Sequence, residues 1–548
     1  MSKIASAVKE AKRVKKSKAV VNYMGGISYE LSPVETLKMV TASSIFAEPA
    51  YYRDGEFASN YLRDSIMRID PIFEPYSLLP DTGEKTSDLM ERIIDEALDY
   101  DFEAVIRWAS VLRKEYMMRL NPQVIMVRAA IHPKRVDFNK ANPGLFSKIN
   151  EQVMARADEP ASQFAYYLYK NGSKASVPNI LKRNWAKRLE TASRYEMAKY
   201  KNGEVGMIDT VRVCHAKGEI IDELMRTGTV SVEEDEQTWE NMRSAGKTWR
   251  EILETCNVMH MALLRNLRGI FTEINDIDIC RQVCEKLKKG VPGGKQFPFR
   301  YWSAYKAIEG ANIYHKPLLL DALEECIDIS CENMPTLKGR TMCLTDNSGS
   351  AWGAFNSEYG SVTVAEIDNL SSVIAARNCD EGYVGKFGDR LEVAPVSGRN
   401  GVLTQTRVLN ADRGRNVGHS TENGIWIFLD KAIREKEHWD NLFIFSDMQA
   451  GHGGLYGTTE GKQEYTKQGY ACRGNYIDVA KLIDVYRSQV NPKINVFSVQ
   501  TAGYNNVVVP EYGYRTNILY GWTGKEIVFA DKMIRFWDQV DKNSEIGR

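Results

Sequence analysis

A change in hydrophobic periodicity near residue 335 constrains the fold of this chain more than any other sequence feature. Before it, apolar residues recur at helical spacing. In the segment 86–100, for example, Leu89, Ile93 and Leu98 lie on one stripe behind Thr86 or Ser87 as a cap. The same periodicity predicts helices at 101–120, 176–200, 246–271, 276–289 and 315–331. Successive amphipathic helices with short connections are typical of stacked antiparallel pairs, as in an α-solenoid. No repeat is evident, and 120–180 remains unassigned.

After residue 335, short apolar runs alternate with helical segments. The runs lie at 341–345, 441–446, 494–500 and 516–521, and the helical segments between them at 364–377, 422–437 and 475–488. Strands that alternate with helices predict a mostly parallel, doubly wound α/β sheet. We therefore expect a basic N-terminal arm at 1–19, a helical-repeat domain at 20–336 and an α/β domain at 337–548. The arm has seven cationic residues and one acid in its first eighteen residues, and is either a solvated tail or a contact for phosphates.

Charge and cysteine content exclude several classes of protein. Lys+Arg and Asp+Glu are both 72, so the chain cannot bind nucleic acid by bulk basicity, although a local basic face remains possible. The nine cysteines are scattered without a CxxC pair, which argues against zinc ribbons and predicts reduced thiols. We find no signal peptide and no apolar run long enough for a membrane span. We expect a cytoplasmic protein without membrane association, and a monomer.

The run 341–345 leads directly into Asp346, Ser348 and Ser350, an Asp-x-Ser-x-Ser motif at the carboxyl end of a predicted strand. Asp447 follows another apolar run, and Thr421 opens a predicted helix. Carboxylate and hydroxyl oxygens are ligands that Mg²⁺ prefers, with Mn²⁺ as an alternative. We therefore predict a divalent-metal site with an open position for an anionic group. The structural alternative is that the serines cap a helix and Asp346 stabilises the turn.

Cations gather around one predicted helix in the first part of the chain. Lys187, Arg188, Arg194, Lys199 and Lys201 lie within seventeen residues of one another and of Trp185. Helical spacing would place Lys187, Arg194 and Lys201 on one face, where they could contact phosphates. The alternative is a solvated helix face, with Trp185 in the core in either case.

Two further groups are candidates for RNA contact. One is His215 with Lys217 at a predicted helix end, and the other comprises Arg265, Asn266 and Arg268 on an otherwise apolar helix. The second group could bind phosphates through its guanidinium groups, or could equally satisfy helix ends. The sequence presents no nucleophile with a base, no phosphate-binding Walker loop and no paired carboxylates, so we expect no enzyme activity.

Several segments resemble the Ro ribonucleoproteins, whose helical TROVE module precedes a von Willebrand factor A domain. The similar segments are 25–33, 184–190, 198–203, 212–217, 261–268 and 297–307. The Asp-x-Ser-x-Ser region, over roughly 338–540, resembles the metal-ion-dependent adhesion site of those A domains. That resemblance assigns Asp346, Ser348 and Ser350 to a first metal loop, Thr421 to a second and Asp447 to a third.

The resemblance implies a ring of HEAT-like helical repeats joined to the A domain. It implies binding of small noncoding Y-like RNA on the outer surface, where His215 and Lys217 match a pair that the family uses. We expect Lys187, Arg188, Lys199 and Lys201 to contribute further RNA contacts through their charge. The resemblance also implies that single-stranded 3′ ends of misfolded RNA enter the hole, for RNA quality control or degradation, with an exoribonuclease linked through the RNA. Two alternatives remain: a scaffold that binds protein through its metal site without RNA, and a metal-dependent hydrolase using Asp346 and Asp447.

Overall fold

The computed structural model describes residues 19–21, 27–43, 86–116, 118–172, 176–199, 205–231, 238–294, 296, 298–353, 363–418, 423–446, 448, 472–473, 476–477, 479–501, 506–509, 513–520, 524 and 526–546. Residues 1–18 of the predicted basic arm therefore lie outside the described part. Within that part, no helix combines the length and apolar character that crossing a membrane requires. The eight cysteines whose side chains are described are free thiols.

The described residues form two compact units. One, the helical unit, comprises 33–43 and 86–258, and the other, the sheet unit, comprises 19–21, 27–32 and the described residues from 259 onward. The boundary predicted at 336/337 marks the change from helices to strand β3 (Leu337–Asp346). The helices between residue 260 and β3 form one compact unit with the strands that follow them.

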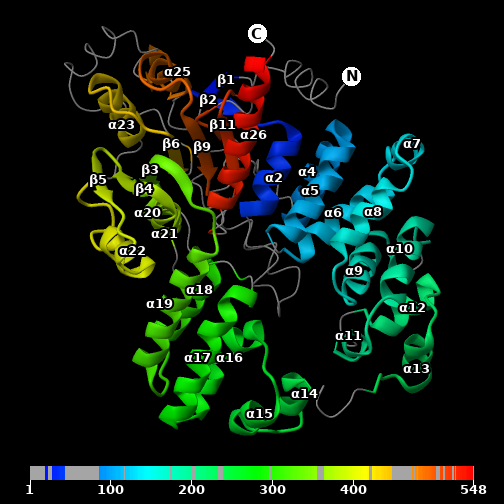
Figure 1. Ribbon diagram of the computed structural model, residues 1–548. Coiled ribbons are helices and arrows are strands. Elements are labelled where there is room, and N and C mark those ends of the chain that lie inside the picture. Colours follow the sequence, from blue (N-terminus) through cyan, green and yellow to red (C-terminus); the bar gives the residue numbers. More distant parts are fainter. Residues whose placement is uncertain are drawn as a thin grey trace. The chain divides into compact units, whose positions relative to one another are not determined.

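The helical unit consists of helices, and from residue 86 onward most connections between them are short (Figure 1). They are α2 (Pro33–Ser43), α4 (Thr86–Tyr100), α5 (Phe102–Lys114), α6 (Leu120–Ile131), α7 (Arg135–Ala141), α8 (Leu145–Val153), α9 (Glu159–Asn171), α10 (Asn179–Glu190), α11 (Arg194–Lys199), α12 (Met207–Cys214), α13 (Glu219–Thr227), α14 (Trp239–Ser244) and α15 (Trp249–Thr255). The helix predicted at 86–100 is confirmed. The single helix expected over 176–200 is wrong, because Ser193 and Glu196 exchange hydrogen bonds that begin a new helix, α11.

A buried polar network fixes α10 against its neighbours. The indole N–H of Trp185 donates to Oε1 of Gln163 on α9 at 2.8 Å, and Gln163 Nε2 donates to Gln123 on α6 and to Asn150 on α8, each at 2.8 Å. Trp185, Gln123, Asn150 and Gln163 are all 0% exposed. Since an unpaired buried amide is costly, these bonds select one orientation of α10. The expectation that Trp185 lies in the core is confirmed.

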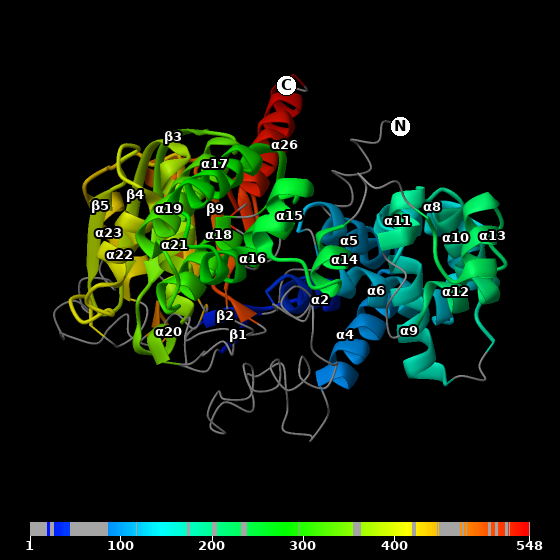
Figure 2. The same cartoon turned by 90° about the horizontal axis from the view of Figure 1, so that it is seen from below.

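In the sheet unit, helices precede, separate and follow the strands (Figure 2). The helices are α16 (His260–Glu273), α17 (Ile277–Gly294), α18 (Pro298–Glu309), α19 (Lys316–Glu332), α20 (Gly349–Gly353), α21 (Val364–Arg377), α22 (Val402–Asn410), α23 (Asn423–Arg434), α25 (Val479–Gln489) and α26 (Glu526–Ile546). The helix predicted at 364–377 is confirmed as α21, whose first turn is held by a capping box between Thr363 and Glu366.

Six strands of the sheet unit form one mixed sheet in the order β11-β9-β6-β3-β4-β5. They are β3, β4 (Cys379–Phe387), β5 (Leu391–Pro395), β6 (Asn441–Ser446), β9 (Asn495–Gln500) and β11 (Thr516–Tyr520). All neighbours are parallel except β4 and β5, so the predicted mostly parallel sheet is confirmed. Every residue of β6 and β9 is buried, as expected for central parallel strands. A small sheet of β1 (Ala19–Val21), β2 (Ile27–Glu30) and β10 (Asn506–Val507) and a pair of β7 (Cys472–Arg473) with β8 (Tyr476–Ile477) complete the strands.

Strand β4 was not anticipated because it carries two glycines and begins with exposed acids. Gly382 is required there: a Cβ at this position would lie 1.9 Å from the backbone oxygen of Ala376 near the end of α21. The glycine therefore lets α21 pack directly on the sheet. Strand β3 has β6 on one side and β4 on the other, so the strand order reverses at β3. In open α/β sheets this reversal leaves a crevice at the carboxyl end of the strand, where β3 places Asp346.

Candidate functional site

The helical unit contains a groove of about 430 Å³ between α10 and the end of α12. Helix α10 contributes one face at helical spacing: Asn179, Lys182, Arg183, Ala186, Lys187 and Glu190. Cys214 and His215 close the groove from α12. Helices α10 and α12 are neighbours in both ribbon views (Figures 1 and 2). The groove therefore combines Lys187 and His215, two residues that sequence reasoning had proposed separately.

The groove carries a local excess of positive charge. Lys182 and Arg183 form no ion pair with a described residue, and Arg183 is exposed. Lys187 Nζ lies 2.7 Å from Glu151, but its side chain is 62% exposed, and surface pairs of this kind contribute about 0–1 kcal/mol. Burial raises the pKa of Cys214, so this thiol stays neutral. The one acid among the lining residues is Glu190.

His215 lies at the rim because of how α12 ends. Its backbone is left-handed, with φ 58°, and its amide donates to the carbonyl of Val211 at 2.8 Å, which closes the helix. Its side chain is exposed. The amide of Lys217 donates to Oε1 of Glu190 at 3.0 Å, which ties the turn after His215 to the end of α10. His215 therefore lines the groove, and Lys217 is next to it through its backbone contact with Glu190 but is not among the lining residues.

Other predicted RNA-binding residues are occupied elsewhere in the helical unit. Arg188 pairs with Glu196 and donates to the carbonyl of Ala155, and its side chain is only 14% exposed. Lys199 lies over the ring of Tyr195 at 5.4 Å. Neither residue lines the groove. Lys201 lies outside the described residues.

Arg194 is a structural residue and does not share a face with Lys187, because α10 ends at Glu190 before α11 begins. It pairs with Glu223 of α13 and donates to the carbonyl of Ser231 at 3.2 Å. The amide and hydroxyl of Ser231, together with Arg194, lower the pKa of Glu223 to about 2. The expectation that Lys187 and Arg194 are neighbours on one helix face is therefore wrong. Lys182 and Arg183 were missed, although Arg183 lies four residues before Lys187 and Lys182 lies four residues before Ala186, spacings that place residues on one helix face.

The predicted group on α16 belongs to the sheet unit, whereas the helices that form the groove belong to the helical unit. Arg265 and Arg268 are exposed, whereas Leu263, Leu264 and Leu267 are buried. The side-chain amide of Asn266 donates to the carbonyl of Ala262 at 2.8 Å within its own helix. The two arginines are thus accessible, and Asn266 has a local structural partner.

At the carboxyl edge of the sheet, Asp346 and Ser348 are fully buried. Oδ1 of Asp346 accepts the amide of Ser348 at 2.9 Å, and Oδ2 accepts the hydroxyl of Ser446 at 2.7 Å. Burial raises the pKa of Asp346, and these hydrogen bonds oppose the rise. Among the described residues, no Lys or Arg forms an ion pair with this carboxylate. A buried, hard oxygen donor without a cationic partner is compatible with a divalent cation.

A network of side-chain amides holds the loop after β3 in place. Asn347 and Asn369 of α21 donate to each other's side-chain oxygens, at 2.8 and 3.1 Å. Asn369 also donates to Oδ1 of Asn410 at 2.7 Å and accepts from the hydroxyl of Thr345 at 2.8 Å. The end of α22 is thereby linked to the loop that follows β3.

The structure places only part of the predicted metal site. Thr421 and Asp447 lie outside the described residues, and only the backbone of Ser350 is described. In the described part of the chain, no three His, Cys, Asp or Glu side chains come together in a way that could hold a metal ion. The hydrogen bond from the Ser348 amide to Asp346 is a contact that the structural alternative, a turn stabilised by Asp346, also expects, and the metal ligand set remains a prediction.

Comparison with known proteins supports one fold assignment. The crystal structure of the Ro (RSR) protein of Deinococcus radiodurans is similar with a TM-score of 0.55, over 81% of this chain and 93% of that chain, at 15% sequence identity. No protein-family model matches the sequence, and no curated protein matches it by sequence. At this identity the similarity establishes the fold, which is that of a Ro protein.

Proposed function

Since the chain has the fold of a Ro protein, we propose that it binds RNA and that the groove between α10 and α12 is one contact surface. The observation that carries the proposal is the convergence of Lys182, Arg183 and Lys187 with His215 around one concave surface. Cations on such a surface can neutralise neighbouring phosphates, and an exposed imidazole can stack on a base or donate to it. Because the chain is neutral overall, affinity must come from local surfaces such as this one.

The proposal extends to the kind of RNA and to the cellular role. We propose that a structured, Y-like noncoding RNA binds at the groove on the outside of a HEAT-like ring, and that single-stranded 3′ ends of misfolded RNA bind elsewhere. The role would be RNA quality control or degradation, with an exoribonuclease recruited through the RNA.

The triple variant Lys182→Gln, Arg183→Gln, Lys187→Gln should weaken RNA binding and reduce its salt dependence. Each lost phosphate contact changes the slope of log K against log salt by about 0.9 for duplex or about 0.7 for single strands, so we expect a change of roughly 2 to 3. Fluorescence anisotropy across salt concentrations, with a hairpin RNA and a single-stranded RNA, measures it. Changing His215 to alanine should weaken the hairpin more than the single strand.

The matched control removes three cations of the same unit that do not line the groove, two of them exposed and Arg92 partly exposed, through Arg92→Gln, Arg107→Gln and Lys140→Gln. It should leave the slope close to that of the wild type. If the groove variant retains both affinity and slope, the α10 face is only a solvated surface and the proposal fails. An absorbance ratio at 260 and 280 nm, before and after nuclease, separates an RNA-binding protein from the alternative, a scaffold that binds protein only.

We further propose that the sheet unit is a von Willebrand factor A-type domain that binds Mg²⁺ or Mn²⁺ at the end of β3. Asp346 and Ser348 would be ligands, with Ser350, Thr421 and Asp447 completing the set. When bound, the cation would supply an electrophilic position for an anionic group of a partner. The residues of this chain would hold the ion, and Ser446 and Asn347 would keep the loop in place through the hydrogen bonds described above.

Asp346→Asn tests this metal proposal. The wild type should gain thermal stability in millimolar Mg²⁺ or Mn²⁺, because binding to the folded state stabilises it by mass action. The variant should show no such gain, since a neutral amide is a poor replacement for the carboxylate. Differential scanning fluorimetry with and without EDTA measures both. Equal responses of the two proteins would refute a metal ligand role for Asp346.

A further inference from the structure

Residues 411–418, which follow α22, form a turn that packs directly on the loop after β3. Gly414 has φ 77°, and a Cβ at this position would lie 2.3 Å from the backbone oxygen of Asn347 and 2.8 Å from Nε1 of Trp352. Only glycine therefore permits this close approach. The hydrogen bond between Asn369 and Asn410 holds the start of the turn at the same edge.

Asp412 organises the turn from inside. Its carboxylate pairs with the buried Lys386 and accepts the amides of Gly414 at 3.3 Å and Asn416 at 2.9 Å. Partial burial opposes ionisation of Asp412, but the bonds from Lys386 and Asn416 outweigh it, so its pKa lies below the usual range. Lys386 of β4 and the amides of the turn therefore neutralise the charge of Asp412. Asp412 forms no ion pair with the flanking Arg413 or Arg415.

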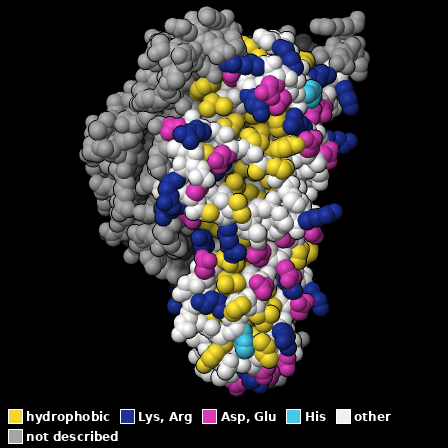
Figure 3. Space-filling view, turned by 90° about the vertical axis from the view of Figure 1, so that its left-hand side faces the viewer, with side chains coloured by type: hydrophobic (Ala, Val, Ile, Leu, Met, Phe, Trp, Pro, Cys, Tyr) yellow, Lys and Arg dark blue, Asp and Glu magenta, His cyan; other side chains and the backbone are white. Residues whose placement is uncertain are grey.

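Arg413 and Arg415 extend from this turn on either side of Gly414, and both are exposed. The guanidinium of Arg413 lies over the indole ring of Trp352, 5.5 Å from its centroid. Arg415 is positioned by a hydrogen bond from Nε to the carbonyl of Asp412 at 3.0 Å. Neither forms an ion pair with a described carboxylate. Figure 3, which views the side of the molecule where α22 and β5 lie in Figure 1, shows Lys and Arg side chains interspersed with Asp and Glu over this face.

A guanidinium that lies over an indole ring has one side toward that ring and keeps its other side available. Its N–H edge can donate to a phosphate, and its other face can stack on a nucleobase, a combination that single-stranded nucleic acid offers. An acidic protein segment would use the charge alone and would gain nothing from the planar stack. Two arginines in place of lysines also suit the geometry of phosphate oxygens.

We propose that Arg413, which lies over the indole ring of Trp352, and Arg415 form a binding surface for single-stranded RNA at the carboxyl edge of the sheet. This surface belongs to the sheet unit and is separate from the groove of the helical unit. It rests on the proposed RNA-binding function, but it requires no metal ion. The two guanidinium groups contact successive phosphates, and the exposed face of Arg413 stacks on a base.

The test uses the full chain and a fluorescein-labelled oligouridine of twelve nucleotides, which has no secondary structure. Arg413→Gln with Arg415→Gln should reduce affinity about tenfold or more and should make the salt slope shallower by about 1.4, two contacts at about 0.7 each. Arg413→Lys alone should keep the slope but lose affinity, because it retains the charge and loses the planar stack. Both arginines are exposed, so unchanged melting temperatures should show that the variants fold.

The control pair is Lys338→Gln with Arg399→Gln. Both side chains are exposed and lie toward the amino ends of the strands, Lys338 near the start of β3 and Arg399 before α22. It removes the same charge and should leave the slope close to that of the wild type. The inference is overturned if the variant that lacks Arg413 and Arg415 and the control pair change the salt slope equally, or if neither changes it. It is also overturned if the Arg413→Gln, Arg415→Gln variant binds labelled oligoglutamate more weakly than the wild type but binds RNA unchanged, since the surface would then bind an acidic protein.

The outcomes separate this inference from the proposed function. If the wild type binds neither the hairpin RNA nor the oligouridine, the proposed function itself fails. If the groove variant loses RNA binding while the Arg413→Gln, Arg415→Gln variant binds oligouridine like the wild type, the groove proposal stands. Only the inference about Arg413 and Arg415 then fails.

Discussion

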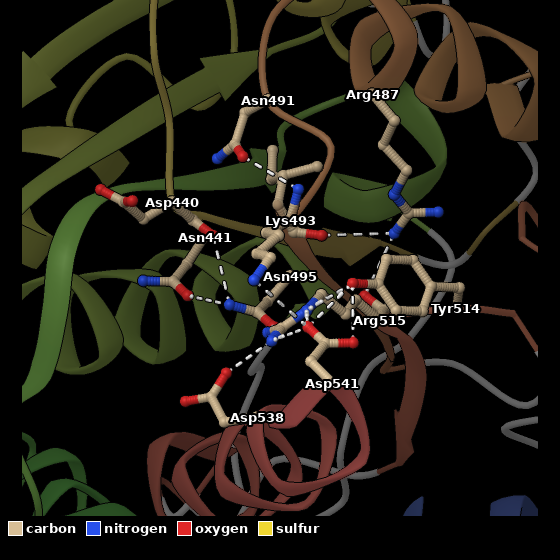
Figure 4. Close-up of polar contacts among 11 residues, drawn as sticks. Asp440, Asn441, Arg487, Asn491, Lys493, Asn495, Tyr514, Arg515, Asp538 and Asp541 are labelled. Atoms are coloured by element: carbon tan, nitrogen blue, oxygen red, sulfur yellow. Dashed lines mark hydrogen bonds and ion pairs between the residues drawn. The ribbon is translucent and has the colours of Figure 1, made fainter. Parts of the chain in front are cut away.

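Replacing Arg515 with alanine should lower the free energy of unfolding of the sheet unit by about 3–5 kcal/mol, the usual cost of removing one partner from a buried ion pair. Arg515 is 3% exposed and pairs with Asp538 and Asp541 of α26, at 2.5 and 2.7 Å (Figure 4). It also donates to Oδ1 of Asn495 at the start of β9, at 2.7 Å. The side chain thus joins the C-terminal helix to the sheet, and its loss would remove a cation 2.7 Å from Asp541, which also accepts from the hydroxyl of Tyr514 at 2.9 Å and lies 3.9 Å from Nζ of Lys493.

Thermal unfolding followed by tryptophan fluorescence measures this effect, because Trp537 of α26 packs on Tyr514 beside Arg515, with ring centroids 5.5 Å apart. Arg535→Ala is the control: its side chain is 74% exposed and pairs with Asp531 within the same helix. It should cost less than about 0.5 kcal/mol, as surface substitutions usually do. Arg515→Lys should fall between the two, since it retains charge but not the forked geometry. Equal losses for Arg515→Ala and Arg535→Ala would contradict the assignment of Arg515 as the anchor of α26.

Replacing Trp185 with alanine should destabilise the helical unit by about 3–5 kcal/mol, the range for large aromatic side chains in a core. The indole is 0% exposed, and its N–H satisfies Gln163 in the middle of the polar network. The loss therefore combines a cavity with an unpaired buried amide oxygen. Urea unfolding followed by far-ultraviolet circular dichroism measures it.

Trp185→Phe separates the two contributions, because it keeps most of the ring but removes the donor, and should cost about 1–3 kcal/mol. Tyr169→Ala, at a side chain that is 69% exposed on α9, is the control and should change stability by less than about 0.5 kcal/mol. Because the face opposite Trp185 carries the groove, Trp185→Phe should retain RNA affinity while it loses stability. A stability loss for Trp185→Ala no larger than that for Tyr169→Ala would mean that the network does not anchor α10.

Local periodicity was sufficient for much of the secondary structure. Segments 86–100 and 364–377 have a continuous apolar stripe and a capping residue, and each is one helix, α4 and α21. The buried runs at 441–446 and 494–500 correspond to β6 and β9. These elements were predictable because burial of one face or of a whole strand appears directly in the order of residues.

Elements were missed where tertiary contacts, and not the local pattern, decide burial. The segment 120–180 forms α6 to α9, but Asn121, Gln123, Asn150 and Gln163 interrupt its apolar pattern. These amides are all 0% exposed. Most of their hydrogen bonds go to other helices, and no single-helix pattern could reveal that. Strand β4 was missed for a similar reason, because Gly382 serves its contact with α21.

The sequence by itself determined that cations gather near α10 and that Asp346 and Ser348 follow a central strand. Only the tertiary structure decided which cations are accessible. Arg188 and Arg194 are cations in the same stretch as Lys187 and Arg183. However, Arg188 forms an ion pair with Glu196, and Arg194 forms one with Glu223. Arg413 gained a possible role only through its contact with Trp352. The physical reason is that the availability of a charge depends on which opposite charge or ring another element brings to it, and that pairing is fixed by packing between elements distant in sequence.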